Sequence, residues 1–183
     1  MSGGAHIDAS NKKVALLIAV LAVVLAFSET LGKGAQTAAL GYNIEAANLW
    51  SFFQAKTIRQ TTMRTAAEGL DAQFGDKAPE AVKKQIETWK KTAERYQSEP
   101  ETNEGRKELA ARAKAAEAKR DRSLASYHHY EVASAAVQIA IVLASAEVIT
   151  GVAALVWASA ALGVGAIAFC LIGFFWPMAV HLF

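Results

Sequence analysis

The residues best suited to chemistry in this sequence lie together in the run Tyr127-His128-His129-Tyr130-Glu131, directly before a long apolar stretch. His128 and Glu131 are three positions apart, so both side chains could reach one metal ion, with His181 or a second subunit completing its ligands. Adjacent histidines point in different directions on a helix, however, and the number of ligands falls short. We therefore favour an interfacial belt of tyrosine and histidine rings at a membrane surface, with no metal or other cofactor.

Two further polar residues lie inside the apolar stretch itself. Glu147 is an ionisable group, and such groups are costly in spanning segments and often mark an ion or proton path. Its carboxylate can reach the interface if the chain turns at Thr150-Gly151, and it is buried if the helix continues. Gln138 is expected to hydrogen-bond to a neighbouring helix. A polar path at Glu147 and Gln138 would suit a small channel or transporter subunit.

Other chemistry is absent from the sequence. It contains no glycine-rich phosphate loop, HExxH motif, nucleophile elbow or carboxylate pair at catalytic spacing, so we predict that the protein is not an enzyme. The single cysteine, Cys170, excludes an intramolecular disulfide, and in an apolar run we expect it to act as a small hydrophobe. Residues 28–131 hold 17 of the 19 basic and 15 of the 17 acidic residues, a balance that gives no reason to expect a nucleic-acid partner.

The apolar residues are segregated toward the two ends of the chain, which predicts membrane-spanning helices there. About 20 apolar residues cross a bilayer as one helix, and the stretch from Val132 to Trp176 is long enough for two. Lys12 and Lys13 precede the first apolar run, which we expect to be retained as a signal anchor rather than removed as a signal peptide. The predicted segments are a polar tail at 1–11, spans at 12–31, 132–149 and 153–176, and a second tail at 177–183.

Between the first two spans, residues 32–131 are predicted to form a helical extramembrane stalk with helices at about 36–74, 79–97 and 101–131. From Tyr42 to Phe74 a seam of mostly apolar residues recurs at spacings of four and three, as in a coiled coil, although Lys56 and Gln60 make its middle polar. Gly32, Gly34 and Gly41 lower the helix propensity before it. We predict an all-α protein whose stalk is an extended antiparallel hairpin, with a compact three-helix bundle as the competing arrangement.

Several residues are candidates for contacts between helices or between copies. Small residues recur every three or four positions in all three spans, a pattern that lets membrane helices approach closely. In the last span this stripe includes Ala158, Ala161 and Gly165. On the stalk, Trp50, Phe53 and Arg59 form an aromatic and basic motif suited to core packing or to a partner. As core, the indole N–H of Trp50 needs an acceptor, and we expect Gln54, one turn on, to supply it. We expect homo-oligomerisation.

The run YNIEAANLWSFFQAKTIR, residues 42–59, resembles a bacterial inner-membrane family catalogued as a domain of unknown function (DUF4337-like). The matching residues are Asn48, Trp50, Phe52, Phe53, Gln54, Lys56, Ile58 and Arg59, and residues 138–145 also look like the family's second span. The resemblance implies an architecture and no activity. Relatives typically carry a basic cluster between the last two spans, whereas Thr150-Gly151-Val152 has none.

The function that these patterns favour is a non-enzymatic, membrane-anchored helical scaffold that assembles with itself or with a larger membrane complex, in contact with lipid. We expect it in the bacterial inner membrane. Lys12 and Lys13 in a short tail favour a cytoplasmic N-terminus, which places the stalk in the periplasm.

Overall fold

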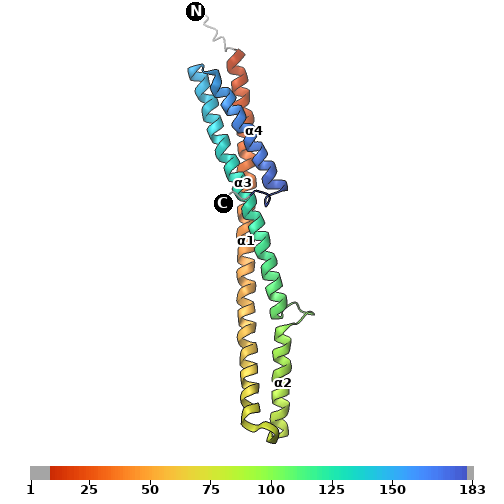
Figure 1. The fold of residues 1–183 in the computed structure, drawn as a ribbon. Helices are drawn as coiled ribbons and strands as arrows, with labels where there is room; N and C mark the ends of the chain where they lie inside the picture. Colours follow the sequence, from red (N-terminus) through yellow and green to blue (C-terminus); the bar gives the residue numbers. More distant parts are fainter. Residues whose placement is uncertain (1–8, 181–183) are drawn as a thin grey trace, which may run out of the picture. The chain divides into compact units, whose positions relative to one another are not determined.

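The computed structural model describes residues 9–180, which are almost entirely helical and contain no strand (Figure 1). The elements in chain order are α1 (Ala9–Phe74), a short 3-10 helix η1 (Gly75–Lys77), α2 (Glu80–Gln97), α3 (Arg106–Thr150) and α4 (Ala153–Phe175). Three of these helices, α1, α3 and α4, are long and apolar enough to cross a membrane. The prediction of an all-α protein is confirmed for the described residues, and the three predicted spans correspond to helices of sufficient length and apolarity.

The chain divides into two compact units. Residues 1–40 and 121–183 make up one, which we call the apolar unit, and residues 41–120 make up the other, which we call the hairpin unit. Helices α1 and α3 each contribute to both units.

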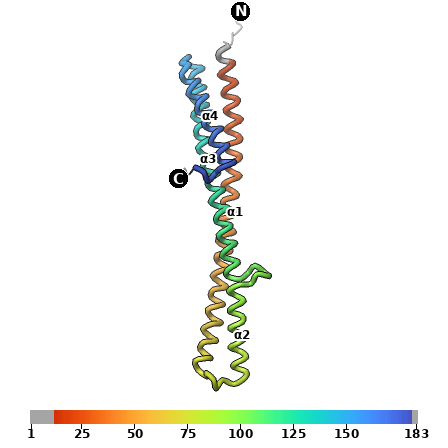
Figure 2. The backbone as a smooth tube through the Cα atoms, turned by 45° about the vertical axis from the view of Figure 1, so that its right-hand side comes forward, coloured from red at the N-terminus to blue at the C-terminus, as the bar shows by residue number. Residues whose placement is uncertain are grey.

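In the apolar unit, α1, α3 and α4 lie side by side (Figure 2). Their shared core contains Leu21, Ala133, Val137, Ala140 and Ala166, and the alanines allow the helix backbones to approach closely. The buried hydroxyl of Ser159 on α4 donates a hydrogen bond to the carbonyl of Ala140 on α3. Gly151, at a φ of 69°, ends α3 in the left-handed region, as the predicted turn requires.

In the hairpin unit, α1 runs antiparallel to α3 and then to α2. Its contacts pair Asn43 with Arg120, Trp50 with Glu117, Thr57 with Arg106, Gln60 with Ala93, and Asp71 with Lys90. Successive positions on α1 therefore meet successively earlier positions of the returning chain. The predicted seam is the buried face of α1, since Ala46, Leu49, Lys56, Gln60 and Ala67 are all buried. Within this unit the contacts describe a hairpin rather than a three-helix bundle.

Two boundaries differ from the prediction. Helix α1 continues through Gly32, Gly34 and Gly41, where we expected a weakened segment, because packing of a helix outweighs a local propensity cost of about 1 kcal/mol per glycine. The third helix begins at Arg106 rather than near residue 101. A turn precedes it, in which Asn103 has a φ of 56° and a Cβ on Gly105 would collide with the backbone nitrogen of Glu99.

Candidate functional site

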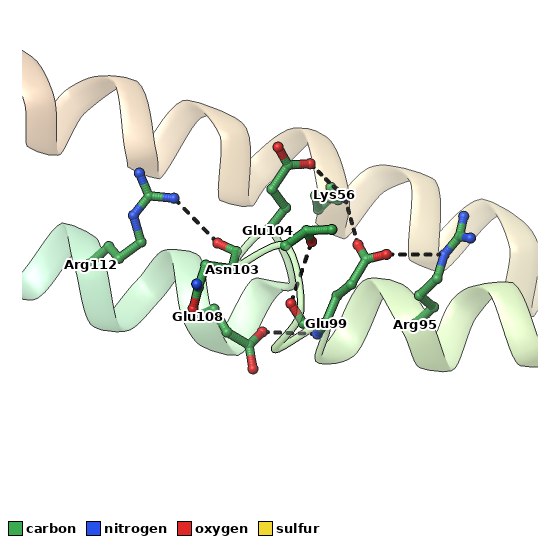
Figure 3. Close-up of polar contacts among 8 residues, drawn as sticks. Lys56, Arg95, Glu99, Asn103, Glu104, Glu108 and Arg112 are labelled. Atoms are coloured by element: carbon green, nitrogen blue, oxygen red, sulfur yellow. Dashed lines mark hydrogen bonds and ion pairs between the residues drawn. The ribbon is translucent and has the colours of Figure 1, made fainter.

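A cluster of polar and aromatic side chains in the hairpin unit surrounds Lys56, which is only 6% exposed. Its ammonium group lies 3.7 Å from a carboxylate oxygen of Glu99 and 3.8 Å from one of Glu104, both in the connection between α2 and α3 (Figure 3). The rings of Phe52 and Tyr96 face the same nitrogen at 5.4 and 5.2 Å. Lys56 therefore ties the connecting loop to α1, and its charge is neutralised within the chain.

A second polar group adjoins it where α1 meets the end of α2 and the start of α3. The Arg106 guanidinium donates to the side-chain oxygens of Thr57, Gln60 and Gln97 and stacks over the ring of Phe53 at 4.9 Å. The buried Gln60 amide also donates to the carbonyl of Ala93 at 3.0 Å. These bonds satisfy a polar position inside a helical core, where an unpaired group would be costly.

The first turn of α3 is fixed to the same loop by Glu108. Its carboxylate accepts hydrogen bonds from the Ser98 hydroxyl at 2.6 Å and from the backbone N–H of Glu99 at 3.1 Å. The hydrogen bond from Ser98, more than any other contact, holds the pKa of Glu108 below the ordinary glutamate value. The contacts of Lys56, Arg106 and Glu108 therefore hold α1, α2 and α3 together where α2 ends and α3 begins, which is a structural role.

Two of the three candidate metal ligands, His128 and Glu131, lie close together. The Nδ1 atom of His128 lies 3.7 Å from a carboxylate oxygen of Glu131, and the Tyr127 hydroxyl donates to the other oxygen at 3.3 Å. His181 lies outside the described residues. Within residues 9–180 no three histidine, cysteine, aspartate or glutamate side chains lie close enough together to hold a metal ion.

Glu147 and Gln138 lie on opposite faces of α3, because nine residues make two and a half turns of an α-helix. Glu147 is 7% exposed, and its Oε2 atom has no hydrogen-bond partner in the described part of the chain. Gln138 is exposed on the outer surface of the unit and donates to the Ser134 hydroxyl at 3.3 Å. The structure therefore does not bring the two predicted polar residues together.

A family model described as a domain of unknown function, DUF4337, matches residues 10–176 of the chain. The chain belongs to the DUF4337 family. No curated protein and no solved structure matches it. The family assignment agrees with the resemblance found at residues 42–59 and covers both units described above.

In this DUF4337 protein the aromatic and basic motif of α1 is divided between two surfaces. Trp50 and Phe53 are half-buried against each other with ring centroids 5.4 Å apart, whereas Arg59 is exposed. The indole N–H of Trp50 donates to a carboxylate oxygen of Glu117 on α3 at 2.8 Å. We expected Gln54, one turn away, as the acceptor; that was wrong, because Gln54 lies on the exposed face.

Of the three stripes of small residues, the one on α3 is buried and those on α1 and α4 are largely exposed. On α3 the stripe is turned inward, and Ala133, Ala140 and Ala144 are fully buried. On α4, Ala158 and Ala161 are exposed and Gly165 is half-buried, while Ser159, Gly163 and Ala166 pack inward. The stripe on α1 is exposed throughout, at Ala15, Ala19, Ala22 and Ala26.

Sequence reasoning missed a buried polar layer in the apolar unit. The Ser28 hydroxyl donates to the carbonyl of Val24 at 2.8 Å and lies 3.2 Å from the Cys170 sulfur. His129 is 1% exposed, with Nδ1 2.7 Å from the carbonyl of Ala125 and Nε2 without a partner in the described residues. Helical spacing could have indicated these positions. Ser28 lies seven residues after the buried Leu21, and His129 lies four residues before the buried Ala133, so each shares a helix face with a core residue.

Proposed function

We propose that this protein is a non-enzymatic, membrane-anchored helical scaffold whose apolar unit assembles with further copies of itself or within a larger membrane complex. The observation that carries the proposal is the outward position of Gln138 on α3. Ser145, seven residues further along, is also exposed, so the two polar side chains share one outer face.

Gln138 lies about 10 Å beyond Glu131, the last charged residue before the apolar run, at about 1.5 Å per residue. Its amide has two N–H groups and an oxygen, of which one N–H is used by Ser134. In hydrocarbon the remaining groups have no water to bond, and an amide on a second copy offers both a donor and an acceptor. Reciprocal hydrogen bonds between two glutamines are therefore the most economical way to satisfy this face.

The outward alanines support the same proposal. Ala15, Ala19, Ala22 and Ala26 leave one side of α1 without large side chains, and Ala158 and Ala161 do so on α4. Helix pairs in a membrane associate through such small residues because their backbones can come close. Since these stripes are exposed among the described residues of the unit, we assign them to contacts between copies.

The test compares Gln138→Leu with Ile139→Leu, a matched control at the next position of α3, which is also exposed. Native mass spectrometry after extraction in a mild detergent is expected to show an oligomer for the wild-type chain and for the control. Two interhelical hydrogen bonds at about 1 kcal/mol each predict a dissociation constant about 30-fold higher for Gln138→Leu. A monomeric mass for the wild-type chain would refute the proposal.

We place the protein in the bacterial inner membrane with a cytoplasmic N-terminus and a periplasmic hairpin unit. Lys12 and Lys13, both exposed before the first apolar run, support this orientation. Ala72→Cys introduces a thiol at an exposed position near the end of α1. It should react with a membrane-impermeant maleimide in cells whose outer membrane alone has been permeabilised, and labelling only after full lysis would reverse the orientation.

A second candidate function, a small channel or transporter subunit, is favoured by Glu147. A carboxylate that is 7% exposed and has an oxygen without a partner in the described residues is costly in apolar surroundings, and such groups often serve ion or proton transfer. If the protein conducts, Glu147→Gln should abolish proton or cation flux in reconstituted vesicles, while Gln138→Leu leaves the conduction of each assembled unit intact. Flux that is absent, or unchanged in Glu147→Gln, would eliminate this function.

A further inference from the structure

A pocket of about 300 Å³ opens between α1 and α3 in the apolar unit. The residues that matter for its chemistry are Ser28, Glu29 and Lys33 on α1, and Tyr127, Tyr130 and Glu131 on α3. Ser28 and Tyr130 are buried and form its wall, while the three charged side chains are exposed at its mouth.

The pocket lies where both helices change from apolar to charged sequence. On α1 the last residue of the apolar run is Phe27, and on α3 Glu131 is the last charged residue before the run that begins at Val132. When these helices span a bilayer, this level coincides with the lipid headgroups, where tyrosine rings are also enriched. The pocket is therefore accessible to a headgroup from the side of the unit.

The two charged residues that α1 contributes to the pocket have no ion-pair partner in the described part of the chain. Glu29 and Lys33 are four residues apart on α1, a spacing that permits an ion pair, yet neither forms one among the described residues. Glu131 contacts His128 and accepts a hydrogen bond from Tyr127. Residues that carry two carboxylates, two phenol groups and one ammonium group thus line the same pocket.

We propose that this pocket binds the headgroup of phosphatidylethanolamine. The primary ammonium of that lipid is a cation with three N–H donors, which suit the carboxylates of Glu29 and Glu131 and the ring of Tyr127. Its phosphate, two carbon atoms away, is an anion that suits the ammonium group of Lys33. The site thus matches a zwitterion, with the acidic groups for the amine and the basic group for the phosphate.

The charge balance selects against other lipids. Phosphatidylglycerol has the phosphate without an amine, so both carboxylates would stay unpaired beside an anion. Phosphatidylcholine keeps the positive charge but has no N–H donors for the carboxylates. Binding is a property of one apolar unit and does not require the self-association proposed above.

The experiment uses the full chain in mild detergent, titrated with each of the three lipids and followed by native mass spectrometry, with bound lipid counted per chain. Phosphatidylethanolamine is expected to bind about tenfold more tightly than phosphatidylglycerol, with phosphatidylcholine between them. Glu131→Gln should weaken phosphatidylethanolamine binding about tenfold, and Lys33→Gln should weaken both zwitterionic lipids. Glu68→Gln and Lys83→Gln, at exposed positions of the hairpin unit, are the matched controls and should change nothing.

Circular dichroism of each variant checks that the helices persist, so that a loss of binding reports the pocket. Equal binding of phosphatidylglycerol and phosphatidylethanolamine, or binding that Glu131→Gln and Lys33→Gln leave unchanged, would overturn the proposal. Soluble phosphoethanolamine serves as a competitor. If it displaces the lipid at equal concentration, the site recognises a soluble zwitterion and the assignment to a membrane lipid is wrong.

Discussion

Replacing Arg106 with leucine should destabilise the hairpin unit through the group it leaves behind rather than through the charge it removes. Arg106 is the only donor to the side-chain oxygen of Gln60 among the hydrogen bonds of the described residues, and Gln60 is 3% exposed. Without the guanidinium, that oxygen is buried and unsatisfied. The other acceptors, Thr57 and Gln97, are less buried and can bond to water.

The magnitude follows from three contributions. A buried unsatisfied acceptor at Gln60 costs about 1–3 kcal/mol. Loss of the cation–π contact with Phe53 costs about 0.5–1 kcal/mol, because Arg106 is partly exposed. Removing a cation from the first residue of α3 returns about 0.3–1 kcal/mol, since positive charge is unfavourable at a helix N-terminus. The expected net loss is about 1–3 kcal/mol, most of it from the unsatisfied oxygen.

A double-mutant cycle isolates that contribution. In a Gln60→Leu background the oxygen is absent, so Arg106→Leu should cost close to nothing, and the coupling between the two changes should be about 1–3 kcal/mol. The assay is urea unfolding of the full chain in micelles, followed by far-UV circular dichroism. Arg112→Leu is the control, because Arg112 is exposed and its hydrogen bond among the described residues goes to the carbonyl of Asn103 at 3.3 Å. Additive effects within about 0.5 kcal/mol would refute the reasoning.

Two further predictions concern pH and packing. The pKa of Glu108 is lowered in the folded state, so its contribution to stability is complete above the ordinary glutamate pKa and is lost as the pH falls through the folded value. Between about pH 5 and about pH 3, the urea midpoint of Glu108→Gln should therefore drop less than that of the wild-type chain. Equal drops would contradict this prediction. In the apolar unit, Gly173→Ala should lower the thermal stability in micelles by about 1–3 kcal/mol, since its Cβ would lie 2.8 Å from the Cβ of His129. The control Gly41→Ala, which meets nothing within 4 Å, should raise stability by up to about 1 kcal/mol, and a loss there would show that helix propensity is not limiting in α1.

Hydropathy and periodicity predict much of this fold. The three apolar helices, the turn at Gly151 and the buried seam of α1 all follow from patterns that extend over many residues, where single exceptions matter little. The seam even includes Lys56 and Gln60 correctly, although they are polar. Local propensity predicted the continuity of α1 less well. Gly34 and Gly41 weaken an isolated helix, but they do not end a helix whose segments before and after them are packed.

The candidate sites depended on information that a single helix does not contain. Periodicity shows which residues share a face, and it does not show whether that face points inward: the stripe at Ala133 is buried, whereas the stripe at Ala158 is exposed. The acceptor for Trp50 is Glu117, 67 positions away, and only the antiparallel register of α1 and α3 brings them together. Gln138 and Glu147 were paired by chemistry, but helical geometry separates them.

The two units differ in whether their buried polar groups have partners among the described residues. In the hairpin unit the buried or half-buried charges of Lys56, Arg106 and Glu108 all have partners within the unit. In the apolar unit, where an unpaired polar group costs more, Glu147 and His129 each keep an atom without a partner in the described residues, and Gln138 faces outward. This difference supports the proposal that partners bind at the apolar unit, because a polar group without a partner costs most in hydrocarbon. In these proposals, further copies of the chain bond to the outward-facing Gln138, and a lipid headgroup occupies the separate pocket lined by Glu29, Lys33 and Glu131.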